Sequence, residues 1–336
     1  MKVIQHSLLF TLAFSLVVTG AEKTKKTTGA AAKNGIQTPG IQIPFASLKA
    51  DAEISLKGQP TAAIFADQIY LVMPESNQLV TVDPKTNKVA EKNIDLTKPC
   101  GSVVRAFGSL WVPNCEKQEL TRIDPKNGQV KATISTGASA FPDSITSTAD
   151  SIWMLADEKT TLLRIDPEQN LVVGEIRLPE KCNSITTGDN SLWVTCPALS
   201  KVLRIDSKKN LLDKQIETAS QPVSATFGEG SLWVLCKAEG KVARIDPKTN
   251  KVSKTIDLEI ADADGKIAFG EGSVWVTTPG FPISRILPDT EKVVQQFKGA
   301  NGGYIDIGLG SVWLASAEGG SVLRIDPRRI SVTLAE

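Results

Sequence analysis

Four of the five cysteines stand in two similar pairs, so thiol chemistry is the first chemistry that the sequence suggests. Each pair flanks a tryptophan, with one cysteine eleven residues before it and the other three or four residues after it: Cys100 with Cys115, and Cys182 with Cys196. If a tight turn separates two strands within each pair, the two sulfurs lie nearly opposite one another on adjacent strands. We therefore predict two disulfides, each within one structural unit, as is common in exported proteins.

Cys236 is the remaining cysteine, and it follows its own tryptophan at the same distance as Cys196. No other cysteine stands at the spacing that would pair with it, so we predict a free thiol that acts as a small buried hydrophobic side chain. The competing interpretation joins Cys196 and Cys236, on neighbouring units, as a soft-metal or redox pair.

Polar residues recur nine to eleven positions before the aromatic residues, where the first strand of each unit would begin. We predict that this set lines one ligand-binding face: Asp143, Asn183, Asp264, Ser102, Ser144, Ser184, Ser224, Lys266 and Tyr304. Asp143, Asn183 and Asp264 could hold a central divalent cation with hard oxygen ligands. The simpler interpretation is that they cap turns and bond to loop amides. We assign no cofactor and no metal site, and we keep the divalent cation as the alternative.

General acid–base residues are scarce. His6 is the only histidine, and it lies in a segment that we expect to be removed on export. Glu116, Asp157, Asp143 and Asp264 could supply a carboxylate base and metal ligands, but no pair stands out by its spacing. The sequence also has no glycine-rich phosphate loop, no Ser/His/Asp or Cys/His set and no zinc signature. The catalytic residues of any enzyme activity are therefore unknown at this stage.

A repeat of about 41 residues positions all of these side chains. The six tryptophans share one register at spacings of 38 to 42 residues, and Tyr70 takes the equivalent place in a first copy. Most copies place an Asp, usually followed by Pro, thirteen residues after the aromatic residue. A unit of this length with several short strands matches one propeller blade. We predict an all-β, seven-bladed β-propeller with four antiparallel strands per blade and the tryptophans packed between blades.

The fifth copy displays the expected strands most clearly, at 223–227, 231–236, 241–246 and 251–258. Each run alternates apolar with polar residues, and the Asp-Pro-Lys-Thr-Asn sequence between the last two is typical of a turn. Two runs, 52–56 and 330–334, compete to be the outermost strand of the seventh blade. An arginine ten or eleven residues after each tryptophan could bind anions, but we assign it to hydrogen bonds within the repeat itself.

The N-terminus differs in composition from the repeats. A lysine, an apolar run and small residues before Glu22 have the order of a secretory signal peptide, which we assign to residues 1–21. Residues 22–46 are polar and rich in Lys, Thr, Ala and Gly, so we predict a flexible linker before a propeller over 47–336. The alternative is an uncleaved anchor. We expect the mature protein to be periplasmic or secreted.

The overall charge narrows the class of partner. With 38 basic and 37 acidic residues, the chain has no strong field to attract nucleic acid. After the N-terminus no apolar run is long enough to span a bilayer, so we expect no integral membrane domain. We predict a monomer whose partner is a protein or a small-molecule ligand.

The repeat motif carries a family resemblance. G-S-L-W-V at 230–234 and V-x-R-I-D-P-K-T-N-K-V at 242–252 resemble the YVTN-type and streptogramin-lyase-like (virginiamycin B lyase-like) bacterial propellers, over roughly residues 50–334. For the lyases, the resemblance implies a catalytic His and Glu with a divalent metal. The mature chain has no histidine. We therefore favour an exported non-catalytic binding or scaffold protein, and keep a metal-assisted lyase or lactonase acting at the channel mouth as the alternative.

Overall fold

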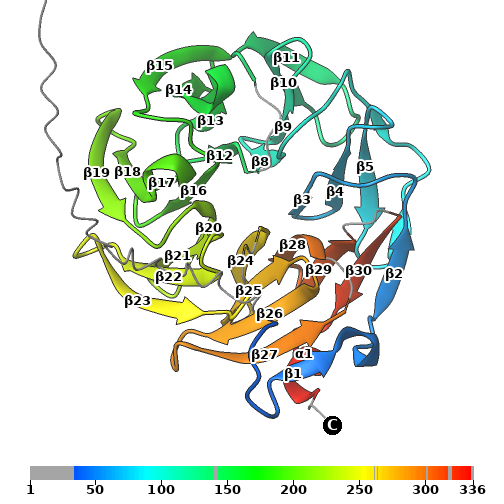
Figure 1. Ribbon diagram of the computed structural model, residues 1–336. Coiled ribbons are helices and arrows are strands. Elements are labelled where there is room, and N and C mark those ends of the chain that lie inside the picture. The colour runs from blue at the N-terminus through cyan, green and yellow to red at the C-terminus, as the bar shows by residue number, and fades with distance from the viewer. Residues whose placement is uncertain are drawn as a thin grey trace, which may run out of the picture. The chain divides into compact units, whose positions relative to one another are not determined.

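Each repeat unit forms a four-stranded antiparallel sheet, and the seven sheets stand as blades around a common centre (Figure 1). This computed structural model describes residues 34–138, 143–260, 262, 264–299, 302–316 and 320–333, so the predicted signal peptide lies outside the described residues. The seven-bladed, all-β architecture that the repeat predicts is confirmed.

The first three blades share one strand order, from the innermost strand outward. Their strands are β3 (Ala62–Phe65), β4 (Ile69–Met73), β5 (Gln78–Asp83), β6 (Lys88–Val89) and β7 (Ile94–Asp95) in blade one; β8 (Val104–Ala106), β9 (Ser109–Asn114), β10 (Glu119–Ile123) and β11 (Val130–Ser135) in blade two; and β12 (Ile145–Ser147), β13 (Ile152–Ala156), β14 (Thr161–Asp166) and β15 (Leu171–Arg177) in blade three. In blade one the outer strand is divided, because β6 and β7 pair with different parts of β5.

The remaining blades follow the same plan. Their strands are β16 (Ser184–Gly188), β17 (Ser191–Cys196), β18 (Lys201–Asp206) and β19 (Leu211–Glu217) in blade four; β20 (Pro222–Gly228), β21 (Ser231–Cys236), β22 (Lys241–Asp246) and β23 (Lys251–Asp257) in blade five; β24 (Lys266–Gly270), β25 (Ser273–Thr278), β26 (Phe281–Leu287) and β27 (Lys292–Lys298) in blade six; and β28 (Gly302–Gly308), β29 (Ser311–Ser316) and β30 (Ser321–Ile325) in blade seven. The strands of blade five agree with the predicted ones to within one residue at each end.

The N-terminal candidate strand closes the ring. β2 (Ala52–Ser55) pairs antiparallel with β30 as the outermost strand of blade seven, next to blade one in Figure 1. In the competing run at 330–334, residues 330–332 belong to the short helix α1 (Pro327–Val332). Asp326 caps this helix by accepting a hydrogen bond from the Arg328 amide, and Pro327 supplies the φ of a first helical residue.

The predicted flexible linker over 22–46 is wrong for residues 34–46, the part of it that the structure describes. β1 (Gln42–Pro44) adds a parallel fifth strand to β27 of blade six. Ile36 donates its amide hydrogen to Gln296 Oε1 at 2.9 Å, and Ile43 is 1% exposed. The prediction failed because it rested on the polar composition of the segment. A few apolar side chains bury enough surface to order it.

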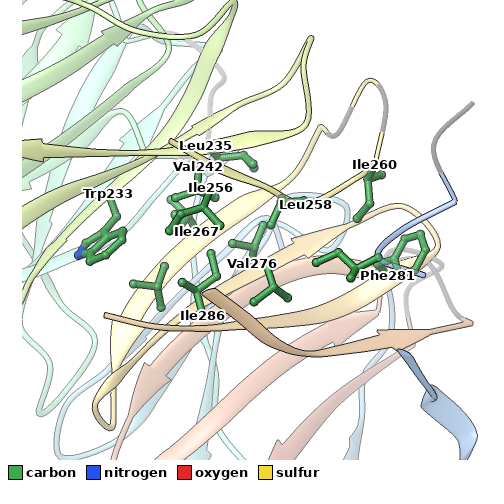
Figure 2. Close-up of a cluster of buried hydrophobic side chains, with 13 residues drawn as sticks. Trp233, Leu235, Val242, Ile256, Leu258, Ile260, Ile267, Val276, Phe281 and Ile286 are labelled. Carbon is green, nitrogen blue, oxygen red and sulfur yellow. The ribbon is translucent and has the colours of Figure 1, made fainter. Parts of the chain in front are cut away.

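The tryptophans form the core between blades, as predicted. Trp233 of blade five shares one buried cluster with Ile267, Val276 and Ile286 of blade six (Figure 2). Each of the six tryptophans is at most 1% exposed and joins a cluster with the following blade, and Tyr70 does the same towards blade two. Because each of these seven aromatic side chains removes some 150–250 Å² from water, the ring depends on these contacts.

An arginine lies directly across the sheet from each tryptophan, and at four junctions it also bonds to the next blade. Arg204 is opposite Trp193 in the strand register, and its guanidinium carbon lies 4.8 Å from the ring centroid. Its Nη1 donates to the Asn250 side chain at 2.8 Å and to the Pro247 carbonyl, both in the turn of blade five. We call this arrangement the arginine clip. It recurs at Arg122, Arg244 and Arg324, which supports the structural interpretation of the arginine ring.

Three junctions differ from this pattern. Arg164 donates to Asp150 in its own blade, at 2.9 Å. Arg285 donates to Gln295, which in turn donates to the carbonyl of Ile330 in α1. Blade one has Thr81 in place of the arginine.

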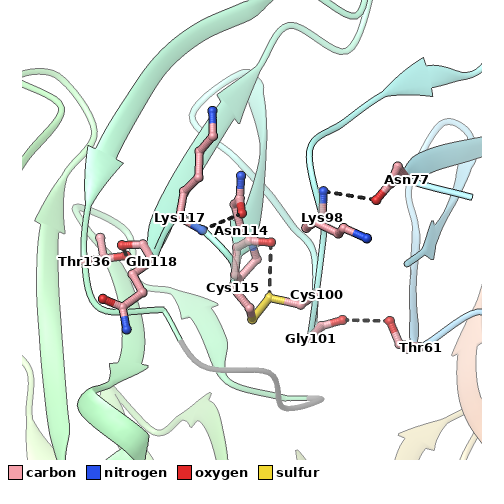
Figure 3. The surroundings of a disulfide bond; sticks show 11 residues. Thr61, Asn77, Lys98, Cys100, Gly101, Asn114, Cys115, Lys117, Gln118 and Thr136 are labelled. Atoms are coloured by element: carbon pink, nitrogen blue, oxygen red, sulfur yellow. Dashed lines mark hydrogen bonds between the residues drawn. A yellow bond between two sulfur atoms is a disulfide. The ribbon is translucent and has the colours of Figure 1, made fainter. Parts of the chain in front are cut away.

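Both predicted disulfides are present. Cys100 bonds to Cys115 and Cys182 bonds to Cys196, so the proposed pairing of Cys196 with Cys236 is wrong. Cys236 is free and buried. Beside the first disulfide, the carbonyl of Gly101 accepts a hydrogen bond from Thr61 of blade one at 3.3 Å (Figure 3). The disulfide therefore fixes a loop that also contacts the neighbouring blade.

Within the part of the chain that the structure describes, no helix has the length and apolar character that a membrane span would need.

The arginine clip predicts a difference between two matched substitutions. Arg204→Met should lower the free energy of unfolding by about 1–3 kcal/mol more than Arg164→Met, measured by urea unfolding. Both variants lose a contact with an indole, a serine hydrogen bond and a surface ion pair, but only Arg204 also bonds to the turn of the next blade. Equal losses in the two variants would mean that the bonds between blades contribute nothing measurable.

Thiol counting checks the disulfides. Without reductant, the denatured protein should contain one reactive thiol, that of Cys236, and after reduction it should contain five. In the native protein the Cys236 thiol should react slowly, because burial raises its pKa to about 11. Five reactive thiols before reduction would contradict both disulfides.

Candidate functional site

The innermost strands surround a cavity of about 250 Å³ at the centre of the ring. Its wall comes from blades one to seven and includes Ser102, Asp143, Lys266, Tyr304 and Asp306. Four of these five belong to the predicted ligand-binding face. The repeat brings them together because it places the start of every first strand at the same level around the axis.

Asp143 and Lys266 form an ion pair within this cavity. Lys266 Nζ lies 2.5 Å from Asp143 Oδ2, and the Ser224 hydroxyl lies 3.5 Å from the same oxygen. The Lys266 and Asp143 side chains are 18% and 24% exposed, so solvent screens the pair only in part. The pair joins blades three and six, which face one another across the channel.

The backbone of Asp143 is held in place by its neighbours on both sides. Its amide donates to the Ser102 hydroxyl of blade two, and its carbonyl accepts from the Ile185 amide of blade four at 2.8 Å. Its φ of 57° lies in the left-handed region, which costs free energy for a residue with a side chain. The two blades therefore hold this carboxylate in the channel wall against a local backbone preference.

Asp306 is a second carboxyl in the wall, and the sequence analysis missed it. Burial raises its pKa to about 7, and the negative charge of Asp143 adds to the shift. The hydrogen bond from the Ile307 amide, at 2.8 Å, opposes the shift but does not cancel it. Nearby, the Tyr304 hydroxyl donates to the carbonyl of Ala63 at 3.2 Å, which joins blades seven and one. A carboxyl with such a pKa can carry or release a proton near neutral pH.

The sequence did contain a signal that distinguishes Asp306, and alignment of the repeat copies reveals it. The seventh position before the tryptophan is Val104, Thr146, Thr186, Thr226 and Ala268 in copies two to six. Only copy seven places a charged residue there, and this position lines the channel.

Lys159 is a further cation at the same face that the sequence did not single out. Its Nζ donates to the Asn183 side chain at 2.8 Å, and its side chain is buried. Burial, followed by repulsion from Lys266, lowers its pKa to about 8. Asp157, Glu158 and Lys159 have φ values of 47°, 53° and 70°, three consecutive left-handed residues. Nothing in the repeat pattern predicts this irregular turn.

The three predicted oxygen ligands do not form one metal site. Asp143 pairs with Lys266, Asn183 accepts from Lys159, and Asp264 lies 2.9 Å from Lys237 Nζ. Each oxygen therefore contacts an ammonium group, which would repel a cation. No group of three or more His, Cys, Asp or Glu side chains converges within the described ranges. Glu116 and Asp157, the other proposed carboxylates, are exposed at the surface.

The four predicted serines, Ser102, Ser144, Ser184 and Ser224, are buried at the joints between blades, and Ser102 also lines the cavity. Ser102 and Ser224 accept amide hydrogens from the following blade, and Ser224 also faces Asp143. Ser144 and Ser184 are each 1% exposed, and their hydroxyl oxygens have no hydrogen-bond partner in the structure. The hydroxyls thus belong mainly to the joints between blades.

Fold and site together define a seven-bladed propeller with a narrow, polar central channel. The chain matches no family model. It also matches no curated protein in sequence.

Solved structures of lyases share this fold. The chain is similar to virginiamycin B lyase from Staphylococcus aureus, with 20% identity and a TM-score of 0.69 over 81% of this chain and 97% of the lyase. It is also similar to a streptogramin B lyase, with 20% identity and a TM-score of 0.68 over 81% of this chain and 96% of that chain. A catalytically inactive variant of the Staphylococcus aureus lyase with quinupristin matches equally well. At this identity the similarity establishes the propeller fold that the motif resemblance predicts.

The raised pKa of Asp306 predicts a pH-dependent stability. Below about pH 4 the carboxyl is protonated in the folded and the unfolded chain, and between about pH 4 and 7 only the unfolded chain releases the proton. This group therefore makes the free energy of unfolding fall over that interval. In Asp306→Asn the fall should be smaller by about 3 kcal/mol, measured by urea unfolding across the pH range.

Asp289→Asn is the matched control, because Asp289 is an exposed carboxylate in a turn of blade six. It should leave the pH profile unchanged. If Asp306→Asn follows the wild-type profile as closely as the control does, Asp306 ionises normally in the folded protein.

Proposed function

We propose that this chain is an exported, non-catalytic binding protein that holds a small ligand, or a side chain of a partner protein, at the mouth of its central channel. The observation that carries the proposal is the Lys266–Asp143 pair, which places one charge of each sign in a cavity of about 250 Å³. A ligand that carries one charge of each sign can replace this internal pair by forming an ion pair with each of the two side chains. We expect the protein to act as a monomer.

Export is part of the same proposal. Two disulfides are typical of an oxidising compartment, and the residues before Glu22 have the order of a signal peptide. A periplasmic or secreted binding protein would meet its ligand in that compartment.

A metal-assisted lyase or lactonase is the second candidate, and one observation favours it. Asp306 has the pKa expected of a general acid or base near neutral pH, and it stands in the channel wall close to Asp143. The solved structures with the same fold include lyases. Against it, Lys266 and Lys159 occupy the oxygens that a metal would need.

The test of the proposal begins with protein recovered from the compartment itself. The chain should begin at Glu22, and native mass spectrometry should detect a small molecule bound one to one and chemically unchanged after incubation with the protein. Lys266→Met should weaken the binding of that molecule by roughly tenfold or more, since it removes one of the two charges. Lys248→Met, in an exposed turn of blade five, is the control and should leave binding unchanged.

Incubation with quinupristin and Mg²⁺ separates the two candidates. The binding proposal expects quinupristin to be recovered unaltered by mass spectrometry. A metal-dependent product that is lost in Asp306→Asn would establish the enzyme instead.

A further inference from the structure

A groove of about 570 Å³ lies between blades one and two, on the face opposite the start of the first strands. Gln68, Thr81, Asn93, Asp95 and Pro125 line it. Gln68 is in the turn before β4, and Pro125 is in the turn that follows β10. The groove is thus separate from the central channel, and the proposed function makes no use of it.

When the repeat copies are aligned, this groove lies where an arginine guanidinium lies at other junctions between blades. Counted from the aromatic residue and from the turn Asp, Gln68 corresponds to Ser191, Thr81 to Arg204 and Pro125 to Pro247. At the junction of blades four and five, those three residues are the guanidinium and two of its partners. Blade one supplies no arginine of its own at this position.

The proline carbonyl of this turn accepts a guanidinium hydrogen bond at four other junctions. Four arginines donate to the equivalent carbonyls of the turn prolines, which are Pro84, Pro167, Pro247 and Pro288. In the groove the Asp95 carboxylate adds a negative charge, and it is positioned by a hydrogen bond of 3.0 Å from Gln78. Lys92 and Lys126 also line the groove, but both residues are exposed and can extend into solvent.

A different contact closes this junction. The two terminal nitrogens of Arg105 in blade two contact the two carboxylate oxygens of Asp67 in blade one, at 3.0 and 3.1 Å. Ile94 packs against Gly128, where other blades have the asparagine that completes the clip. The ring therefore stays closed at this junction, and Asp95 at the groove is exposed to solvent.

We propose that this groove binds an arginine side chain presented by a partner protein. The arginine would lie between Thr81 and Pro125, as the intramolecular arginines lie between their own strand and the next turn. Its guanidinium donates to the Pro125 carbonyl and to the Asp95 carboxylate. The partner would thereby complete the arginine clip that blade one lacks.

The test uses N-acetyl-arginine amide as the probe, followed by the backbone amide signals of Thr81 and Gly128 in NMR titrations. Binding of a single side chain should be weak, with a Kd on the order of 1–10 mM. N-acetyl-citrulline amide has the same shape without the charge and should bind at least about fivefold more weakly. Thr81→Arg should abolish binding of the arginine probe and raise the melting temperature, because its own side chain fills the groove.

Thr249→Arg is the matched control, since Thr249 is an exposed residue in a turn of blade five. It should retain wild-type binding. Asp95→Asn is a second variant in case Thr81→Arg does not fold, and it should weaken the arginine probe at least about threefold.

Three results would overturn the proposal. They are no shift of the Thr81 and Gly128 signals with the arginine probe, equal binding of the citrulline probe, or undiminished binding of the arginine probe in whichever of Thr81→Arg and Asp95→Asn folds. Inorganic phosphate is the last arm of the test. Shifts at the same signals with phosphate and none with the arginine probe would assign the groove to anions held by Lys92 and Lys126.

Discussion

The contact between a tryptophan and the blade that follows it is the interaction on which the whole structure depends. A single blade has two apolar faces and no core of its own, so it is stable only between two others. The indole fills the space between two sheets, and the arginine opposite it carries the contact from the apolar interior to a polar turn of the next blade. One cross-strand pair thus combines apolar burial, a cation–π contact and directional hydrogen bonds.

This packing also determines where function can lie. Because the blades are wedged together by the middle strands, the first strands meet only at the central axis and leave a narrow channel. The groups that converge there come from blades far apart in sequence, as with Asp143 and Lys266. Their positions are held by hydrogen bonds between blades, so that a ligand would meet a rigid set of charges. Departures from the repeat, such as Asp306 in blade seven and Thr81 in blade one, are the places where something other than stability is expected.

The strands, the blade count, the indole core and both disulfides were predictable from the sequence, because each depends on a pattern that recurs at a fixed period. The face that carries Asp143, Lys266 and Tyr304 was predictable for the same reason. Lys159 was not, since its irregular left-handed turn occurs in one blade only. The order in residues 34–46 was also missed, because a few buried side chains such as Ile43 decide it against a polar composition. The sequence could not show which of the predicted oxygen ligands would contact a lysine. That depends on how side chains face one another in three dimensions, and residue spacing contains no such information.

Hydrogen exchange of the six indole N–H groups tests the central claim most directly. Five of these groups donate to the carbonyl of the residue five positions earlier, as Trp233 does to Gly228 at 3.1 Å, and Trp153 donates to Thr148. If the indoles hold the ring together, all six protons should exchange slowly and with one common free energy, equal to that of global unfolding. Fast exchange at several indoles while the backbone strands stay protected would show that the blades are held together by something else.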